Sequence, residues 1–277
     1  MGTKRKSGIM PELLLDFSQS WSERLDLVKH IKDKEILQKA LKETPEAEIR
    51  TAIVYETEDQ DLLEQVAYHD DDPSVRKHAV SKLSGDNSEV LIYVIRNDPD
   101  PTVRTEAVTK LHPGHQMIYH EILMKETHSQ VRRRAQHKIR LDLLKTDELT
   151  DLAIAAQEPL VRKGAVYQLE DQDSLKAVAI HGEDYKIIEL AIDKIENETY
   201  LKEIAQQAEF AHGRYYAIYK ITDQDFIADV FRHEDNIEVK KTCVEQIEEK
   251  NLLIKLFEEA DIQFQTIIGE KINNIST

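Results

Sequence analysis

Histidines are the residues of this chain best suited to metal or acid–base chemistry, and six of the eleven lie between His78 and His137. His112 and His115 flank a Pro-Gly pair, and His120 precedes a glutamate. This arrangement predicts a turn followed by a helix. It lacks the His-x-x-x-His register with a flanking carboxylate that a helical zinc site needs. We therefore expect no metal site and no cofactor.

Paired carboxylates are the next group with potential chemistry, because two of them can act as general acid and base. The tripeptide Asp-Gln-Asp occurs three times, ending at Asp61, Asp173 and Asp225. Each copy precedes an apolar segment, so we interpret its final aspartate as an N-cap that accepts from free backbone N–H groups. Asp72 and Asp100 precede prolines and are interpreted as caps of the other helices. The sequence contains no glycine-rich phosphate loop, Gly-x-Ser-x-Gly or Cys-x-x-Cys motif.

These residues belong to an internal repeat. The segment Asp72–Leu83 returns at Asp100–Leu111, and the valine of each Val-Arg pair serves as an anchor for a frame along the chain. The frame contains ten anchors, spaced 25 to 30 residues apart: Glu23, Ile49, Val75, Val103, Val131, Val161, Ile187, Gly213, Val239 and Phe264. Small or apolar residues follow at four, five and eight places after the anchor, which predicts one apolar stripe of an α-helix.

A second apolar segment recurs between the anchored helices, as in Leu62–Ala67, so each repeat is predicted to be a pair of antiparallel helices. The spacer lengthens to 30 residues between Val131 and Val161, where we expect a local change in pitch. We predict an N-terminal segment over 1–21, made of a tail and a capping helix that begins at Pro11. A single repeat domain is predicted over 22–277. The fold class is therefore all-α, a right-handed α-solenoid of about ten helical pairs.

The Asp-Pro-x-Val-Arg-x-x-Ala-Val-x-x-Leu pattern at 72–83 and 100–111 resembles the HEAT-like repeats found in phycobilisome lyases. The resemblance extends from about residue 22 to 272. It implies an α-solenoid whose second helices line the concave face, with the arginine after each anchor bridging to an acidic residue of the next repeat. It does not imply a particular function. From the residues themselves, we expect ion pairs of these arginines with acids such as Asp72, Asp100, Glu158 and Asp184.

The outward positions of the anchored helices are more basic than the rest of the chain, which has a net charge of −16. Aromatic residues follow on the same predicted face. A cationic groove beside aromatic side chains suits an acidic peptide, phosphate groups or a nucleic-acid strand. The predicted partner-binding residues are Lys77, Lys110, Arg133, Arg134, Lys138, Lys163, Tyr167, Tyr215 and Tyr219.

Two further patterns have catalytic counterparts. His120-Glu121 and His233-Glu234 resemble the His-Glu dyads of the HEAT-repeat deoxyhypusine hydroxylases, but that family uses four symmetric dyads and these two are unmatched. Cys243 takes the small core position that alanine holds in six other copies, which predicts a buried thiol and not a nucleophile.

We therefore expect a noncatalytic scaffold or adaptor whose partner is a protein with an acidic segment. One alternative is a nucleic-acid-binding protein similar to the HEAT-like alkylpurine DNA glycosylases, although those are basic and this chain is acidic. Another is a relative of the bilin lyases, suggested only by the repeat type. A single cysteine and the lack of an apolar run of about 18 residues predict a cytoplasmic protein without a membrane segment.

Overall fold

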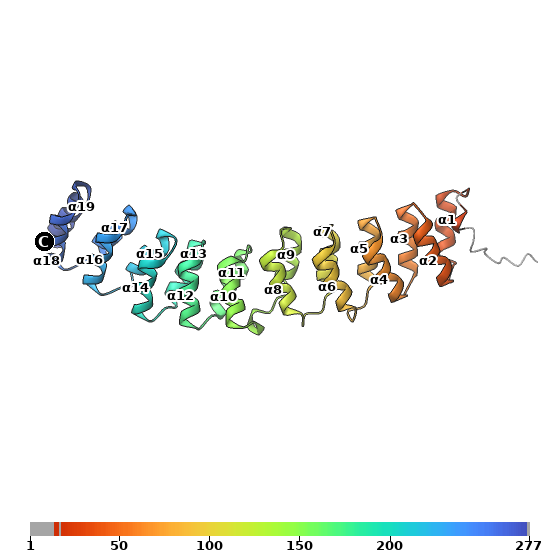
Figure 1. Ribbon diagram of the computed structural model, residues 1–277, viewed down its shortest axis with the longest axis horizontal. Coiled ribbons are helices and arrows are strands. Elements are labelled where there is room, and N and C mark those ends of the chain that lie inside the picture. The colour runs from red at the N-terminus through yellow and green to blue at the C-terminus, as the bar shows by residue number, and fades with distance from the viewer. Residues whose placement is uncertain (1–13, 17, 276–277) are drawn as a thin grey trace, which may run out of the picture. The chain divides into compact units, whose positions relative to one another are not determined.

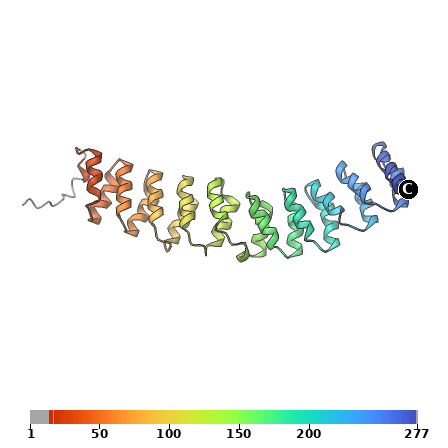
Figure 2. The same cartoon turned by 180° about the vertical axis from the view of Figure 1, so that it is seen from behind.

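The computed structural model describes residues 14–16 and 18–275, and this part of the chain contains nineteen α-helices and no strand. The prediction of an all-α fold is confirmed. The chain divides into two compact units, Met1–Ile139 and Arg140–Thr277. Each unit is a row of antiparallel helix pairs (Figures 1 and 2). The expected capping helix at 11–17 falls mostly outside the described residues.

In the first unit, the even-numbered helices are the first helices of their pairs and the odd-numbered ones are the anchored second helices. The second helices pack in succession, and those from α3 to α9 each also pack on the first helix of their own pair. The elements are α1 (Trp21–Val28), α2 (Lys34–Glu43), α3 (Ala47–Glu56), α4 (Gln60–His69), α5 (Pro73–Lys82), α6 (Ser88–Asn97), α7 (Pro101–Lys110), α8 (Gln116–Lys125) and α9 (Ser129–Gln136).

The second unit repeats this arrangement after a short 3-10 helix. Its elements are η2 (Leu141–Leu143), α10 (Thr146–Ala155), α11 (Pro159–Gln168), α12 (Gln172–His181), α13 (Tyr185–Asp193), α14 (Glu198–Gln207), α15 (Ala211–Ile218), α16 (Gln224–His233), α17 (Ile237–Gln246), α18 (Lys250–Glu259) and α19 (Ile262–Ile275). The residues that lengthen the spacer form η2, and the Leu141 side chain lies against Gly164 of α11, where an added Cβ would be 2.7 Å from the leucine Cδ1.

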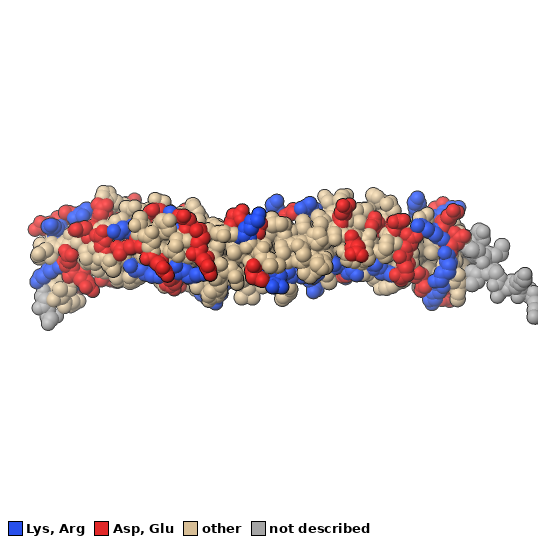
Figure 3. All heavy atoms as spheres, turned by 90° about the horizontal axis from the view of Figure 1, so that it is seen from below, with Lys and Arg blue, Asp and Glu red and all other residues tan. Residues whose placement is uncertain are grey.

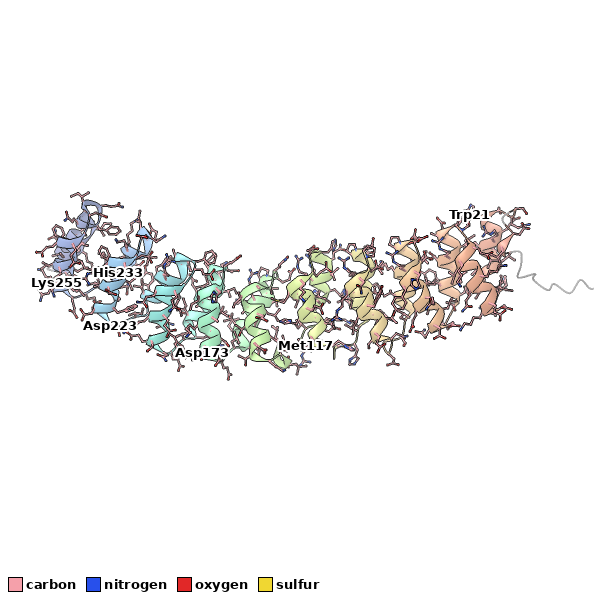
Figure 4. All side chains as sticks on the ribbon, viewed as in Figure 1. Trp21, Met117, Asp173, Asp223, His233 and Lys255 are labelled. Carbon is pink, nitrogen blue, oxygen red and sulfur yellow. The ribbon has the colours of Figure 1, made fainter. Side chains whose placement is uncertain are left out.

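First and second helices begin at opposite edges of each unit. In the first unit, Trp21 lies at the upper edge in Figure 4, where α1 begins, and Met117 lies at the lower edge near the start of α8. In the second unit, Asp173 and Asp223 mark the lower edge, where α12 and α16 begin. The loops within pairs therefore line one edge of a unit, and the loops between pairs line the other.

The apolar stripe accounts for the core. Nine of the ten anchors are buried, from Ile49 to Phe264, and so are all eight valines or isoleucines five places after the anchor. Glu23 is the exception: it is exposed and forms a capping box with Ser20 at the start of α1. Helices of about ten residues are only marginally stable alone, so this shared burial between neighbouring pairs holds them in place.

The arginine after the anchor forms the main polar connection between neighbouring pairs. In Arg76, Nε and Nη2 donate to the two carboxylate oxygens of Asp98, at 2.7 and 2.9 Å. Its Nη1 donates to the carbonyl oxygens of Asp70 and Asp71, at 2.9 and 3.2 Å. The guanidinium thus ties the loop within its own pair to the loop within the next pair. We call this arrangement an arginine bridge.

Arginine bridges recur along both units. The arginine–carboxylate pairs are Arg50–Asp70, Arg76–Asp98 and Arg104–Glu126 in the first unit, and Arg162–Asp184 and Arg214–Glu234 in the second. Each of these arginines also donates to two carbonyl oxygens of its own loop. At α1 the arrangement differs, because Arg24 binds Glu46, the Thr44 hydroxyl and the Leu14 carbonyl.

Consecutive bridges share residues. The Asp98 carboxylate accepts from Arg76, and the Asp98 carbonyl accepts from Arg104 at 2.9 Å. Glu126 does the same with Arg104 and Arg132, whose Nη1 lies 3.0 Å from the Glu126 carbonyl oxygen. The first unit therefore carries a continuous line of charge-assisted hydrogen bonds along the edge with the loops within pairs.

The sequence predicted this row of ion pairs but assigned two partners wrongly. Asp184 does bind Arg162, whereas the carboxylates of Asp72 and Asp100 accept from Ser74 and Thr102 at the starts of α5 and α7. The ion-pair partners are the residues two places earlier, at the ends of the first helices. An aspartate before a proline is held at the helix start as a cap, so its carboxylate is not free to reach the preceding repeat.

The cap in Asp-Gln-Asp was also assigned to the wrong aspartate. The first residue of each tripeptide is the N-cap: Asp59, Asp171 and Asp223 accept from the N–H groups of Leu62, Ser174 and Phe226. The glutamine reaches the next loop between pairs, as Gln60 accepts from Ser84 N–H at 2.8 Å and donates to the carbonyl of Lys82 at the end of α5. Gln172 and Gln224 bind the next loop in the same way.

We predict that Arg76→Ala lowers the free energy of unfolding by about 3 kcal/mol, because it leaves the buried Asp98 carboxylate without its cation. The two side chains are only 9% and 4% exposed. The double variant Arg76→Met/Asp98→Leu should recover most of this loss, because it removes both charges. Urea denaturation followed by circular dichroism measures both, with Lys77→Ala as the exposed control. An Arg76→Ala protein as stable as the control would contradict the role of the bridge.

The bridges should also make stability depend on acid. Burial raises the pKa of Glu126, but the hydrogen bonds from Arg104 and from the His128 N–H lower it by more than burial raises it. The pKa of Glu126 is therefore below its ordinary value of 4.5. A lowered folded-state pKa contributes stability that is complete above the unfolded-state value and is lost as pH falls through the folded-state value. Between about pH 5 and pH 3, Glu126→Gln should therefore lose less stability than the parent chain. Urea denaturation across this pH range measures the free energy of unfolding. Glu89→Gln, at an exposed position, is the control and should follow the parent chain. Parallel profiles of stability against pH for all three chains would refute the prediction.

Candidate functional site

The cations predicted to bind a partner divide into two classes in the structure. Lys138 belongs to the first class, because its ammonium donates to the carbonyl oxygens of Thr109 and Leu111 at the end of α7, the latter at 2.8 Å. It is partly buried, and burial, followed by the nearby Arg134, lowers the pKa of its ammonium. Lys138 therefore connects two helix pairs in this structure.

This connection recurs seven places after the anchor. The lysine there donates to carbonyl oxygens near the end of the preceding second helix, in Lys82, Lys138, Lys194, Lys220 and Lys271. Such lysines satisfy backbone groups that a helix end leaves unpaired and complement its negative end. Lys138 was predicted to be a surface cation, although the recurrence of lysine at this fixed position was a detectable signal of a structural role.

The second class comprises Lys77 of α5, Lys110 of α7, and Arg133 and Arg134 of α9. Lys77, Arg133 and Arg134 are exposed and Lys110 is half-buried. None of their four side chains makes a hydrogen bond or ion pair with another described residue, in contrast to the arginines of the bridges. Their helices pack side by side, α5 on α7 and α7 on α9. We call these four residues the basic surface.

The other four predicted residues lie in the second unit. Lys163 and Tyr167 share α11, with the ammonium 5.6 Å from the ring centroid, and Tyr167 is 56% exposed. Tyr215 lies on α15 and Tyr219 is the C-cap of that helix, with ring centroids 6.5 Å apart in an edge-to-face arrangement. The structure thus places five of the nine predicted residues on the first unit and four on the second.

The tyrosines of α15 and of its C-cap lie beside carboxylates, one of which, Asp193, also pairs with Lys220 at 3.5 Å. The Tyr216 and Tyr219 hydroxyls each donate at 3.2 Å, to Asp193 and Glu245 respectively. Burial and these carboxylates raise the pKa of both phenols. Tyr215 hydrogen-bonds His212, whose other ring nitrogen lies 2.9 Å from Glu189. These contacts connect α13, α15 and α17.

The histidines between His78 and His137 do not converge. Gly114 N–H donates to the His112 ring, and His115 Nε2 lies 3.1 Å from the Ser88 hydroxyl. Among the described residues, no group of three or more histidine, cysteine or acidic side chains could hold a metal ion. The glutamates of the two His-Glu dyads are bound to arginines, Glu121 to Arg96 and Glu234 to Arg214.

Cys243 lies in the core of the second unit. It is 0% exposed on α17, and burial, followed by the charge of Glu234, raises the pKa of its thiol to about 12. A thiol with so high a pKa carries almost no thiolate at neutral pH, which removes the basis for a nucleophilic role.

Charges of opposite sign alternate over much of the second unit. Figure 3 shows bands of acidic side chains with basic ones between them toward the C-terminal end of one face. Lys202–Asp223 and Arg232–Glu259, each 2.7 Å apart, are ion pairs of this unit. Such exposed pairs contribute little stability, but they neutralise each other's charge.

No family model and no curated protein matches this sequence. No helix among residues 14–16 and 18–275 is both long enough and apolar enough to cross a membrane.

We predict that Lys138→Ala lowers the free energy of unfolding by about 1.5 kcal/mol, because charge-assisted hydrogen bonds to two carbonyls at the end of α7 are lost. Arg134→Ala, four residues earlier in α9, should change it by less than about 0.5 kcal/mol. Thermal unfolding of the two variants side by side distinguishes a structural cation from a surface one. Equal losses would show that the two classes are not distinct.

Proposed function

We propose that the chain is a noncatalytic scaffold whose basic surface holds an acidic segment of another protein. The observation that carries the proposal is the contrast between paired and unpaired cations. The arginines of the bridges and most lysines seven places after the anchor already have partners, whereas Lys77, Arg133 and Arg134 have none among the described residues. Unpaired cations on packed helices are available to carboxylates of a partner.

Rigid support favours this use of the surface. The helices α5, α7 and α9 are fixed to one another by buried stripes, arginine bridges and lysine contacts. A preorganised row of cations loses little conformational entropy when it binds an extended acidic segment. We also retain the HEAT-like repeat type as a proposal, supported by the stacked helix pairs and the repeated Val-Arg position.

Lys163, Tyr167, Tyr215 and Tyr219 remain predicted contacts on the second unit. Lys163 and Tyr167 could add a cation and an aromatic side chain to an acidic partner's site. The carboxylates around Tyr215 and Tyr219 suit an acidic segment less well, because like charges repel.

Fluorescence anisotropy with a labelled poly-glutamate peptide tests the proposal. We expect binding that weakens with salt and falls at least about tenfold in Arg133→Glu/Arg134→Glu, because each reversal converts an attraction into a repulsion. The matched control is Lys39→Glu/Lys125→Glu, which changes net charge equally on α2 and α8. The control should bind like the parent chain.

The same titration with single- and double-stranded oligonucleotides separates the partner classes. If an oligonucleotide binds through Arg133 and Arg134 while the peptide does not, the surface is a nucleic-acid site and the proposal is wrong. Equal loss of peptide binding in both double variants would show that only net charge matters, and would also overturn it.

A further inference from the structure

Three cavities occupy the same place in the repeat, between the ends of consecutive first helices. In the first unit, a cavity of about 870 Å³ lies between the ends of α2 and α4, and one of about 240 Å³ lies between those of α4 and α6. In the second unit, a cavity of about 610 Å³ lies between the ends of α10 and α12. Arg50, Arg76 and Arg162, each from an arginine bridge, form one wall of each cavity.

The largest cavity combines an apolar floor with an acidic rim. Leu62 and Val66 of α4 line it and are only 4% and 6% exposed, and Leu41 lines it from α2. Its volume falls within the range of sites that enclose a ligand or several side chains. Arg50 and Asp70 neutralise each other in its wall, which leaves the acidic charge of the rim to other residues.

Asp71 is an unpaired acidic residue of this rim, which also contains the exposed cation Lys42. Asp71 is exposed, and its carboxylate makes no hydrogen bond or ion pair with any described residue. It lines both the 870 Å³ and the 240 Å³ cavities, together with His69 and Asp70. The two cavities therefore meet at the loop between α4 and α5.

The smaller cavity adds aromatic side chains beside Asp71. Tyr68 and Tyr93 line it with ring centroids 4.9 Å apart in an edge-to-face arrangement, and Tyr93 is 51% exposed. An exposed tyrosine ring near a carboxylate attracts a lysine or arginine side chain by its π-face as well as by charge.

The second unit contains a similar combination. Its cavity is lined by His181, Glu183 and Tyr185, and by Ile154 as an apolar contribution. His181 and Glu183 stand at the same positions of α12 and its loop as His69 and Asp71 do of α4. Glu183 and Tyr185 are both exposed.

From these features we infer that the first-unit cavities form a docking site for a protein segment in which a lysine or arginine neighbours an apolar side chain. The apolar side chain enters the cavity over Leu62 and Val66. The cation lies against Asp71 and the Tyr93 ring. This site is separate from the basic surface in residues and in sign of charge, so the scaffold would hold two segments of opposite charge.

The test uses a short fluorescein-labelled peptide of alternating lysine and leucine, titrated with the full chain. Asp71→Lys should weaken binding at least about tenfold, since it replaces the attraction at the rim with repulsion. Gln65→Trp, which places an indole at an exposed lining position of the large cavity, should weaken it similarly. Asp86→Lys, with the same charge change in an exposed loop between pairs, is the control and should leave binding within about twofold of the parent.

Three outcomes would overturn the inference. They are equal binding of a peptide with glutamate in place of lysine, equal losses in Asp71→Lys and Asp86→Lys, and unchanged binding in Gln65→Trp. Sedimentation of the chain alone tests whether a second copy of the chain occupies the site. Self-association that Asp71→Lys abolishes would assign the site to that second copy. Because Arg133 and Arg134 are not involved, their variants should bind this peptide normally whether or not the proposed function holds.

Discussion

The arginine bridge is the interaction on which the rest of each unit depends. Apolar stripes bring the helices together, but burial alone has little directional preference. Each bridge fixes the direction, because one planar guanidinium binds a carboxylate of the next pair and two carbonyls of its own loop. Ile188, buried at 1%, takes the place of the arginine in α13. This replacement agrees with the finding that apolar groups can substitute for buried ion pairs in stability.

The bridges also determine which charges remain available at the surface. Arginines at the loops within pairs and lysines at the loops between pairs are bound to backbone and carboxylate oxygens. The charged groups that stay unpaired include the cations of Arg133 and Arg134 and the carboxylate of Asp71. An acidic chain can therefore present surfaces of both signs, and net charge alone does not describe its partners.

The sequence predicted the helices and their buried stripe well, because periodicity reports directly on which side chains share a face. It did not predict which aspartate acts as a cap or as an ion-pair partner. Asp59 and Asp61, or Asp70 and Asp72, lie two residues apart, and only the backbone geometry of the loop decides between them. The role of Lys138 was missed because its acceptors are carbonyl groups, which every residue carries, so only the recurrence of lysine seven places after the anchor marked it. The cavities depend on the separation of first helices, which periodicity does not report.

Amide hydrogen exchange of the loops within pairs measures directly whether the arginine bridges hold these loops in place. The amides of Asp100 and His128 donate to the bridging carboxylates of Asp98 and Glu126, so they should be protected nearly as well as helical amides despite lying in loops. In Arg76→Met, protection should fall at Asp100 and at the neighbouring ends of α6 and α7, while amides of the second unit stay unchanged. If the amides of Asp100 and His128 exchange in the parent chain as fast as those of the exposed Gly85–Asp86 turn, the arginine bridges do not hold the loops in place.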